Sequence, residues 1–424
     1  MTKFTANTVE LNLPADWNWA DHLPAEAHLF MRNGEGLIGF GQVARLSASG
    51  PHRMQKLKAD WLAWLENCDV SDSVKAVGSG PVAFGTIAFS DHSALESTLI
   101  VPEVLVFRTA NRSWLTRIHR ADLPADEAAT AINFWSQTAG STGLSGAGLA
   151  AKLSFVEGQQ SEQDFCNSVS SAVAKIKAGE LGKVVLARDI VAEVDGSLDL
   201  NPTLAKLAKR YPNCWTYQVD GMFGASPELL VRSHRGEVSA RVLAGTAGRG
   251  TDPSIDSAIS AALASSAKNR SEHAYAVESL VNALRPYCSE LRADEQPFSL
   301  ALPNLWHLAS DVQGVLREDA SSLDIAAVLH PTAAVAGTPT ETALALIDQL
   351  EPFDRGRYAG PVGWIDANGD GEWAIALRGA QATEANGRTT VRAYAGCGIV
   401  AESDPAAELA ETDLKFAPIR NAFA

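Results

Sequence analysis

Charged residues recur at helical spacing near the C-terminus and suggest one chemically active helix face. Glu408, Glu411 and Lys415 are three and four residues apart, so a helix places them on the same side. Lys268 and Glu272 are four apart in an earlier helical stretch. Taken alone, each of these two groups of residues is more simply explained as a solvent-exposed helix face with an ion pair. If a glutamate from each helix points inward, the two helices could hold a hard cation such as Mg²⁺ with substrate oxygens.

Two further charges lie inside apolar runs. Lys183 opens the run Lys-Val-Val-Leu-Ala-Arg, and Glu228 directly precedes Leu-Leu-Val. A charge in such a place is costly unless it is paired or neutralised, and burial lowers the pKa of a Lys while it raises that of a Glu. The two residues are therefore a candidate base and acid. The alternative is that both are strand-end charges that reach water.

Glycine-rich segments precede both helical stretches. Gly396-Cys397-Gly398 comes before the C-terminal helix, and Gly245 and Gly248 come before the earlier one. Glycines at a strand-to-helix junction let the backbone approach an anion and point helix N–H groups at it. We therefore expect both segments to border a binding site.

The elements that must position these residues include hairpins and long helices. Asn368-Gly369 and Asn386-Gly387 predict hairpin turns. They predict an antiparallel meander from the runs 360–365, 372–381 and 389–400. Helix starts are predicted at Asp252-Pro253, for a helix that runs to about Leu284, and at Asp404-Pro405. This mixture favours an α+β fold over a doubly wound parallel sheet.

The rest of the chain supplies further strand and helix patterns. Other strands are expected over 37–46, 82–89, 98–107, 183–188, 215–219, 228–233 and 238–244, and other helices over 54–67 and 161–178. Residues 1–135 form an N-terminal half with less specific signals. Residues 136–150 are rich in Ser and Gly and are expected to be an exposed loop. The region 151–420 carries the densest motifs.

Composition limits the possible functions. Of the 424 residues, 46% are hydrophobic and 20% are charged, as in soluble globular proteins. The 50 acidic and 35 basic residues give a net charge of −15, which disfavours general binding to nucleic acid or anionic membranes. Five widely spaced cysteines and the lack of an export signal indicate a cytoplasmic protein with reduced thiols. No exposed heptad is evident, so we expect a monomer.

Taken together, the motifs resemble those of the chorismate-utilising enzymes, most closely the isochorismate synthase branch of the menaquinone-pathway type. The likeness runs in family order over about 180–416 and is weaker in the N-terminal half. The matching stretches are GKVVLAR (182–188), GASPELLVR (224–232), LAGTAGRG (243–250), KNRSEH (268–273), LWHLASDVQG (305–314), LHPTAAVAGTPT (329–340), EPFDRGRYAGPVGW (351–364), IALRGAQ (375–381) and YAGCGIVAESDPAAELAETDLKF (394–416).

The resemblance implies one enzyme domain over 1–424, with an antiparallel β-sandwich core, flanking helices and a Mg²⁺-dependent site. It implies that Glu272 and Glu411 bind the metal, with Glu408 close by. It also implies that Lys183 is the base that activates water and Glu228 the acid that protonates the departing C4 hydroxyl. The residues implied to line the chorismate site are Gly245, His307, Ala334, Arg378, Gly396 and Lys415.

Alternatives within the family depend on two positions. Anthranilate and aminodeoxychorismate synthases use ammonia and typically carry Gln where this chain has Lys183, so Lys favours water as the nucleophile and no glutaminase subunit is expected. Salicylate synthases typically carry Thr where this chain has Ala334, so Ala favours isochorismate as the final product. Asn269 departs from the family's more frequent acidic residue and could loosen the surroundings of Glu272. A non-catalytic chorismate-binding regulator is the alternative from another class.

Overall fold

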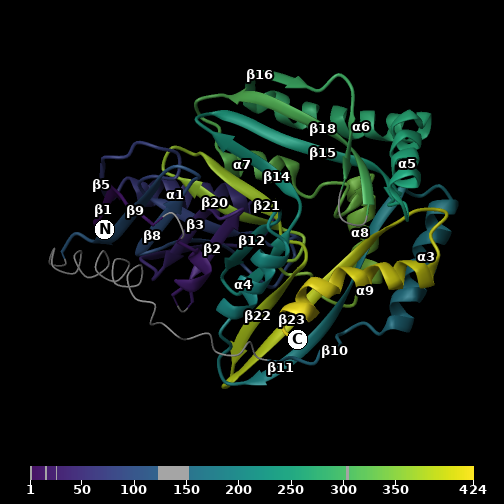
Figure 1. The fold of residues 1–424 in the computed structure, drawn as a ribbon, viewed down its shortest axis with the longest axis horizontal. Coiled ribbons are helices and arrows are strands. Elements are labelled where there is room, and N and C mark those ends of the chain that lie inside the picture. Colours follow the sequence, from purple (N-terminus) through teal and green to yellow (C-terminus); the bar gives the residue numbers. More distant parts are fainter. Residues whose placement is uncertain (1, 15–16, 25, 123–151, 302–304) are drawn as a thin grey trace.

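The computed structural model describes residues 2–424 except 15–16, 25, 123–151 and 302–304. Its strands form two large sheets, which share a hydrophobic core and are flanked by helices (Figure 1). This confirms the expected α+β fold with an antiparallel β-sandwich core; the pairing of the first and fifth strands is parallel. The Ser/Gly-rich loop expected at 136–150 lies outside the described residues.

Both sheets contain strands from both halves of the chain. Sheet A runs, in spatial order, β10 (Val156–Glu157), β11 (Lys183–Asp195), β23 (Arg388–Ile399), β22 (Gly379–Ala385), β13 (Met222–Ser226), β12 (Trp215–Val219), β2 (His28–Arg32), β3 (Glu35–Phe40), β8 (Val104–Arg108), β9 (Ser113–Arg120), β1 (Phe4–Glu10) and β5 (Cys68–Asp72), while β19 (Gly337–Thr338) also pairs with β11. Sheet B runs β16 (Cys288–Ala293), β18 (Leu305–Leu316), β15 (Glu237–Gly248), β14 (Leu229–His234), β21 (Gly371–Ile375), β20 (Pro361–Asp366), β6 (Val82–Thr86), β7 (Ser97–Val101) and β4 (Ala44–Ala48), while β17 (Phe298–Ala301) pairs with β18.

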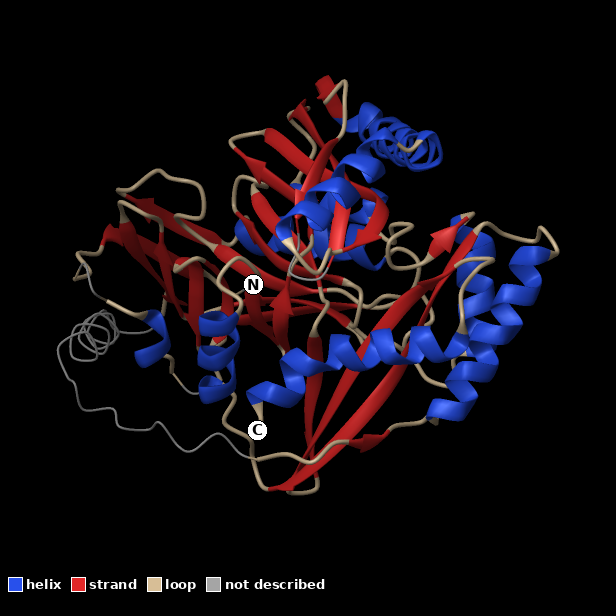
Figure 2. Cartoon of the chain, turned by 45° about the vertical axis from the view of Figure 1, so that its right-hand side comes forward, coloured by secondary structure: helices blue, strands red, loops and turns tan. Residues whose placement is uncertain are grey.

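The helices pack around the sheets (Figure 2). They are α1 (Arg53–Leu65), α3 (Glu162–Lys177), α4 (Asn201–Arg210), α5 (Pro253–Ser265), α6 (Ala267–Leu284), α7 (Ser322–Leu329), α8 (Thr340–Leu350) and α9 (Pro405–Ala422), with 3-10 turns η1 (Trp19–Asp21) and η2 (Arg285–Tyr287). None of the helices in the described ranges is both long enough and apolar enough to cross a membrane.

The central strands of sheet A are buried on both faces, and each face packs against a different hydrophobic core. On β2, Phe30 belongs to the core shared with sheet B, whereas its neighbours Leu29 and Met31 belong to a second core beneath α4 and α9. Contacts such as the edge-on packing of Phe107 against Trp364, with ring centroids 5.6 Å apart, join the two sheets. The sandwich therefore holds strands from distant parts of the sequence in fixed positions.

The structure corrects several local predictions. The strands expected over 37–46 and 98–107 are each two strands that belong to different sheets: β3 and β4 in the first case, and β7 and β8 in the second. The helix expected from 253 to 284 is two helices, because Ser266 takes an extended conformation and its side chain caps α6. The run 372–381 is not one strand of a meander; it divides into β21 of sheet B and β22 of sheet A. Gly245 and Gly396 lie within strands β15 and β23 and do not form loops at helix N-termini.

Candidate active site

Glu228 lies just before β14, where backbone hydrogen bonds fix its position. Its N–H donates to Ser226 Oγ at 3.2 Å, and its carbonyl accepts from Ile375 N at 3.0 Å. Burial raises the pKa of the Glu228 carboxyl, although positive charges on Arg378, Lys183 and Lys415 act in the opposite direction. The carboxyl is thus a desolvated acid that interacts with cations from three other segments of the chain.

Lys183 is the first residue of β11 and is half-buried between two strands. On one side it pairs with Thr338 of β19, and on the other β11 pairs with β23. The side chain packs over Gly398: a Cβ atom at residue 398 would lie 2.8 Å from Lys183 Cε and 3.4 Å from Nζ. The absence of a side chain at Gly398 therefore makes the room that the Lys183 amine occupies.

Arg378 lies at the crossing between β21 and β22, which takes the chain from one sheet to the other. Its φ of +50° is left-handed, an unusual conformation for a residue with a side chain. Tyr217 Oη donates to the carbonyl of the preceding residue, Leu377, at 3.0 Å and so braces the crossing. A guanidinium placed in this way can bind a carboxylate through two parallel hydrogen bonds.

His307 and Gly245 face each other across a bulge in sheet B. The register of β15 against β18 shifts between Ala244 and Thr246, and Gly245 has a φ of +79° there. Burial lowers the pKa of His307; a hydrogen bond to the Gly245 backbone opposes this, while the charges on Lys183 and Lys415 lower the pKa further. A neutral imidazole beside the two amines can donate a hydrogen bond to an anion without adding charge.

Lys415 ties α9 to β23. Its Nζ donates to the carbonyl of Gly396 at 2.7 Å and pairs with Glu411 at 2.6 Å. Burial raises the pKa of the Cys397 thiol, and the Glu408 and Glu411 carboxylates raise it further. The three charged residues of α9 therefore face the same part of β23, as their spacing predicts.

The structure describes the side chains of two of the three predicted metal ligands. Glu408 and Glu411 are half-buried neighbours on α9, but the side chain of Glu272 lies outside the described part of the structure. Its helix, α6, packs on β15 and β18 of sheet B, whereas α9 packs on β23 of sheet A. Among the described residues, no group of three His, Cys, Asp or Glu side chains is arranged to hold a metal ion.

Gly245 and Ala334 are the remaining predicted residues of the chorismate site. A Cβ at residue 245 would lie 3.2 Å from the Cβ of Asn269, so α6 approaches the bulge closely. Ala334 is exposed on the loop that leads into β19, the strand that pairs with Lys183. Lys183, Glu228, His307, Arg378 and Lys415 thus form one group of interacting polar side chains, with Gly245 and Gly396 at its margins.

Comparison with known proteins identifies the family of the chain. The family model described as "Chorismate binding enzyme" matches residues 4–424. The chain belongs to the chorismate-binding enzyme family. It is 32% identical over 368 residues to isochorismate synthase MenF of Bacillus subtilis, across 81% of this chain and 74% of that protein. It is 40% identical over 266 residues to isochorismate synthase DhbC of the same species, across 60% of this chain and 66% of that protein.

The fold is also similar to that of a solved structure. The menaquinone-specific isochorismate synthase MenF from Escherichia coli aligns with a TM-score of 0.76 at 23% identity, over 100% of this chain and 95% of that chain. At this identity the match concerns the arrangement of the elements alone. The two-sheet architecture of this chorismate-binding enzyme is thus shared with a solved member of the family.

Two tyrosines that the sequence does not indicate as site residues interact with Arg378. Burial raises the pKa of Tyr358 to about 12, with Arg355 and Arg378 opposing the shift, and its ring stacks on Tyr394 at 5.1 Å. Burial also raises the pKa of Tyr217, again against Arg378. Both tyrosines lie in segments that the sequence marks as a strand or a family motif, but nothing in the sequence shows that they flank the arginine.

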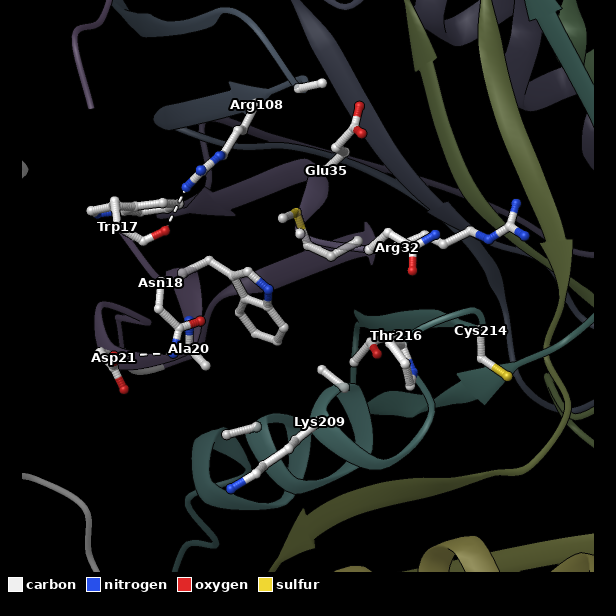
Figure 3. A pocket seen from close by; sticks show the side chains of 18 of the residues that line it. Trp17, Asn18, Ala20, Asp21, Arg32, Glu35, Arg108, Lys209, Cys214 and Thr216 are labelled. Atoms are coloured by element: carbon white, nitrogen blue, oxygen red, sulfur yellow. Dashed lines mark hydrogen bonds between the residues drawn. The ribbon is translucent and has the colours of Figure 1, made fainter. Parts of the chain in front are cut away.

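A cavity of about 850 Å³ lies apart from this group (Figure 3). It lies between η1, the β2–β3 hairpin and α4, and Figure 3 shows Trp17 and Arg108 on one side of it and Lys209 on α4. The Arg108 guanidinium already donates to the carbonyl of Trp17 at 2.5 Å. The cavity lining contains none of the predicted site residues, so cavity size alone does not indicate where the chemistry occurs.

Proposed function

We propose that this chorismate-binding enzyme converts chorismate into isochorismate. Water forms a bond to C2 and the bond from C4 to its hydroxyl breaks. Both conjugated ring double bonds shift, from C1=C2 and C5=C6 in chorismate to C1=C6 and C4=C5 in the product. The atoms of substrate and product balance, so the reaction is an isomerisation by net hydroxyl transfer. The names of the relatives support this activity, and the chain carries the charged groups that such a reaction requires.

Lys183 and Glu228 have the central roles in this proposal. The water must lose a proton as it attacks, and the departing hydroxyl must gain one. Lys183 accepts the first proton, which requires a neutral amine, and Glu228 supplies the second, which requires a protonated carboxyl. The raised pKa of Glu228 supports its acidic role, because burial favours the protonated form. The grouping of Lys183, Glu228 and Arg378 is the observation that carries the proposal.

The remaining residues of the group bind the substrate. Chorismate carries two carboxylates, and a protein with a net charge of −15 needs local cations to attract it. In our proposal Arg378 and Lys415 provide these charges, His307 donates a neutral hydrogen bond, and Gly245, Gly396 and Ala334 leave room for the ring. Lys183 in place of Gln disfavours ammonia as the nucleophile, and Ala334 in place of Thr disfavours pyruvate elimination.

Mg²⁺ is part of the proposal as the expected cofactor. Glu408 and Glu411 are half-buried, act on the same thiol of Cys397, and offer the oxygen donors that a hard cation prefers. These residues fit such an ion, which they would hold together with Glu272. When bound, the cation neutralises the ring carboxylate of chorismate and so favours the charge that develops during the reaction.

We further propose that the product supplies menaquinone synthesis, that the enzyme is monomeric and that it acts without a glutaminase subunit. The alignment to MenF of Bacillus subtilis, which extends over 81% of this chain, supports the first of these. A siderophore pathway is the alternative, and the chain is also similar to the isochorismate synthase DhbC of the same species. Deleting the gene separates them: loss of menaquinone supports our proposal, and loss of a catechol siderophore contradicts it.

One incubation tests the activity. Purified protein is mixed with chorismate and Mg²⁺, and the products are separated by liquid chromatography. We expect isochorismate from the wild type and none from Lys183→Ala or Glu228→Gln. Lys175→Ala, which removes a surface ion pair with Glu180, is the matched control and should behave as wild type. Salicylate with pyruvate would identify a salicylate synthase, and unchanged chorismate would favour a regulator.

A further inference from the structure

One edge of β11 is completed by side chains at the point where neighbouring strands are missing. β19 pairs with the strand at Lys183 and Val184, and β10 pairs with it again at Ile190 and Val191. Between them, Ala187 N donates to Glu351 Oε1 at 2.7 Å, and Val185 O accepts from Arg355 Nη2 at 2.7 Å. Two side chains thus take the place of a strand along the segment that follows Lys183.

The same guanidinium also holds the loop that carries Ala334. Arg355 Nη1 donates to the carbonyl of Val335 at 2.9 Å, while Ala336 O accepts from Val185 N at 2.8 Å. Arg355 therefore bridges the Lys183 strand and the Ala334 loop. A planar guanidinium is suited to this bridge because its donors diverge at fixed angles, which an ammonium cannot reproduce.

The bridge is rigid because Glu351 orients it in a buried setting. Arg355 donates to both carboxylate oxygens of Glu351, at 2.8 and 2.6 Å, and each side chain is only 2% exposed. The Phe89 ring covers the guanidinium, with its centroid 4.5 Å away. Separating the two side chains would leave a buried charge without its partner, which is energetically costly. The Glu351 carboxylate and the Arg355 guanidinium are therefore held in this arrangement.

We infer that the Glu351–Arg355 pair is a positioning element that sets the place of the Lys183 amine relative to the Ala334 loop. This inference rests on the proposed function, in which Lys183 accepts the proton of the attacking water. Neither side chain is assigned a contact with substrate. The pair acts through β11: it holds the first residues of the strand in line with β19, and so fixes where the Lys183 side chain starts.

A purely structural role is the alternative, and Arg357 provides the matched control. The side chain of Arg357 is 4% exposed, against 2% for that of Arg355. It donates to Asp220 and to the carbonyl of Glu96, joining other parts of the two sheets and not β11. Arg357→Gln should therefore disturb folding about as much as Arg355→Gln without moving Lys183.

The test compares Arg355→Gln with Arg357→Gln for turnover and for the reactivity of Lys183. For Arg355→Gln we expect kcat to fall about 100-fold with KM within about threefold, because misplacing a catalytic group lowers the rate more than binding. Acylation of Lys183 by a succinimidyl ester, followed by mass spectrometry, should be faster by about fivefold or more as the strand loosens. Arg357→Gln should leave kcat and labelling within about threefold of wild type.

Equal effects of the two variants on kcat and labelling would overturn the inference. If circular dichroism shows that Arg355→Gln is unfolded, Arg355→Lys decides, because it keeps the charge but not the bridge. We then expect a fall in kcat of about tenfold with faster labelling of Lys183; wild-type values for both would also overturn the inference. If the wild type leaves chorismate unchanged, the proposed function is wrong. The positioning role of the pair is still tested in that case, because labelling of Lys183 needs no turnover.

Discussion

The Lys183 side chain packs against the bare Cα of Gly398, so that a Cβ at residue 398 would come within 2.8 Å of Lys183 Cε. Gly398 lies in β23, the strand that pairs with β11 along most of its length. A glycine without positive φ is often replaceable by alanine, but here the added methyl would overlap the lysine. The position of the amine therefore depends on the absence of one methyl group on the neighbouring strand.

Replacing Gly398 by Ala should displace the Lys183 amine and lower the activity. We expect kcat to fall about 10- to 100-fold with a small change in thermal stability, since a long flexible side chain can move aside. Initial rates of isochorismate formation and a melting curve measure the two effects. Gly248→Ala is the matched control, because a Cβ there meets nothing within 4 Å. Equal rates for both variants would show that the amine does not act from this place.

Replacing Glu228 by Gln should remove the proposed acid while keeping the shape of the side chain. Loss of a general acid lowers kcat by about 10²- to 10⁴-fold. In the wild type, activity should fall as pH rises through the carboxyl's pKa, which burial holds above its usual 4.5. That limb of the pH–rate profile should be missing from the residual activity of the variant. Glu372→Gln, which alters a carboxyl paired with Arg232, should retain the wild-type profile.

The sequence predicted correctly those turns and helix starts that depend on one or two particular residues. Asn386 and Gly387 have φ of 53° and 73°, as the hairpin turn between β22 and β23 requires. Asp404 caps α9 by accepting from Ala407 N at 2.9 Å, at the predicted start of the helix. The face shared by Glu408, Glu411 and Lys415 then follows from helical periodicity alone.

Features that depend on long-range packing could not be predicted in this way. The break at Ser266 leaves a helical pattern on both sides, because a serine is acceptable inside a helix and as an N-cap. The residues before the crossing at Arg378 form a continuous apolar run (373–377), so the sequence does not show that β21 and β22 belong to different sheets. Glu351 and Arg355, four residues apart, look like a surface ion pair until the structure shows their burial.

Replacing Glu411 by Gln should weaken the binding of Mg²⁺ and its effect on activity. Removing one carboxylate ligand takes away a negative charge and one oxygen donor, so we expect the affinity for Mg²⁺ to fall about 10- to 100-fold. Isothermal titration of the protein with MgCl₂ measures this without turnover. Chelation with EDTA should abolish wild-type activity, and added Mg²⁺ should restore it. Glu402→Gln, on an exposed side chain before α9, should bind as wild type does. Unchanged affinity in Glu411→Gln would contradict the proposed metal site.

Asp366 should make the stability of the protein depend on pH near neutrality. Its buried carboxyl accepts from the backbone N–H of Gly78 at 3.0 Å and of Asn368 at 2.8 Å, between β20 and β21. Burial raises its pKa from 3.8 to about 7. The folded state therefore binds this proton more tightly than the unfolded state does. The resulting stabilisation is complete below 3.8 and is lost as pH rises through about 7.

Comparing the wild type with Asp366→Asn isolates this contribution. His28 and His330 act in the opposite sense, because burial lowers their pKa to about 4 and about 3, so their contribution is lost as pH falls below 6.5. Both histidines are present in the variant, so the difference between the two proteins cancels them. Between about pH 5 and about pH 8, the wild type should lose on the order of 1–4 kcal/mol of unfolding free energy relative to the variant. Urea titrations of both proteins at the two pH values measure the difference, and parallel pH dependences would mean that Asp366 is already ionised in the folded state at about pH 5.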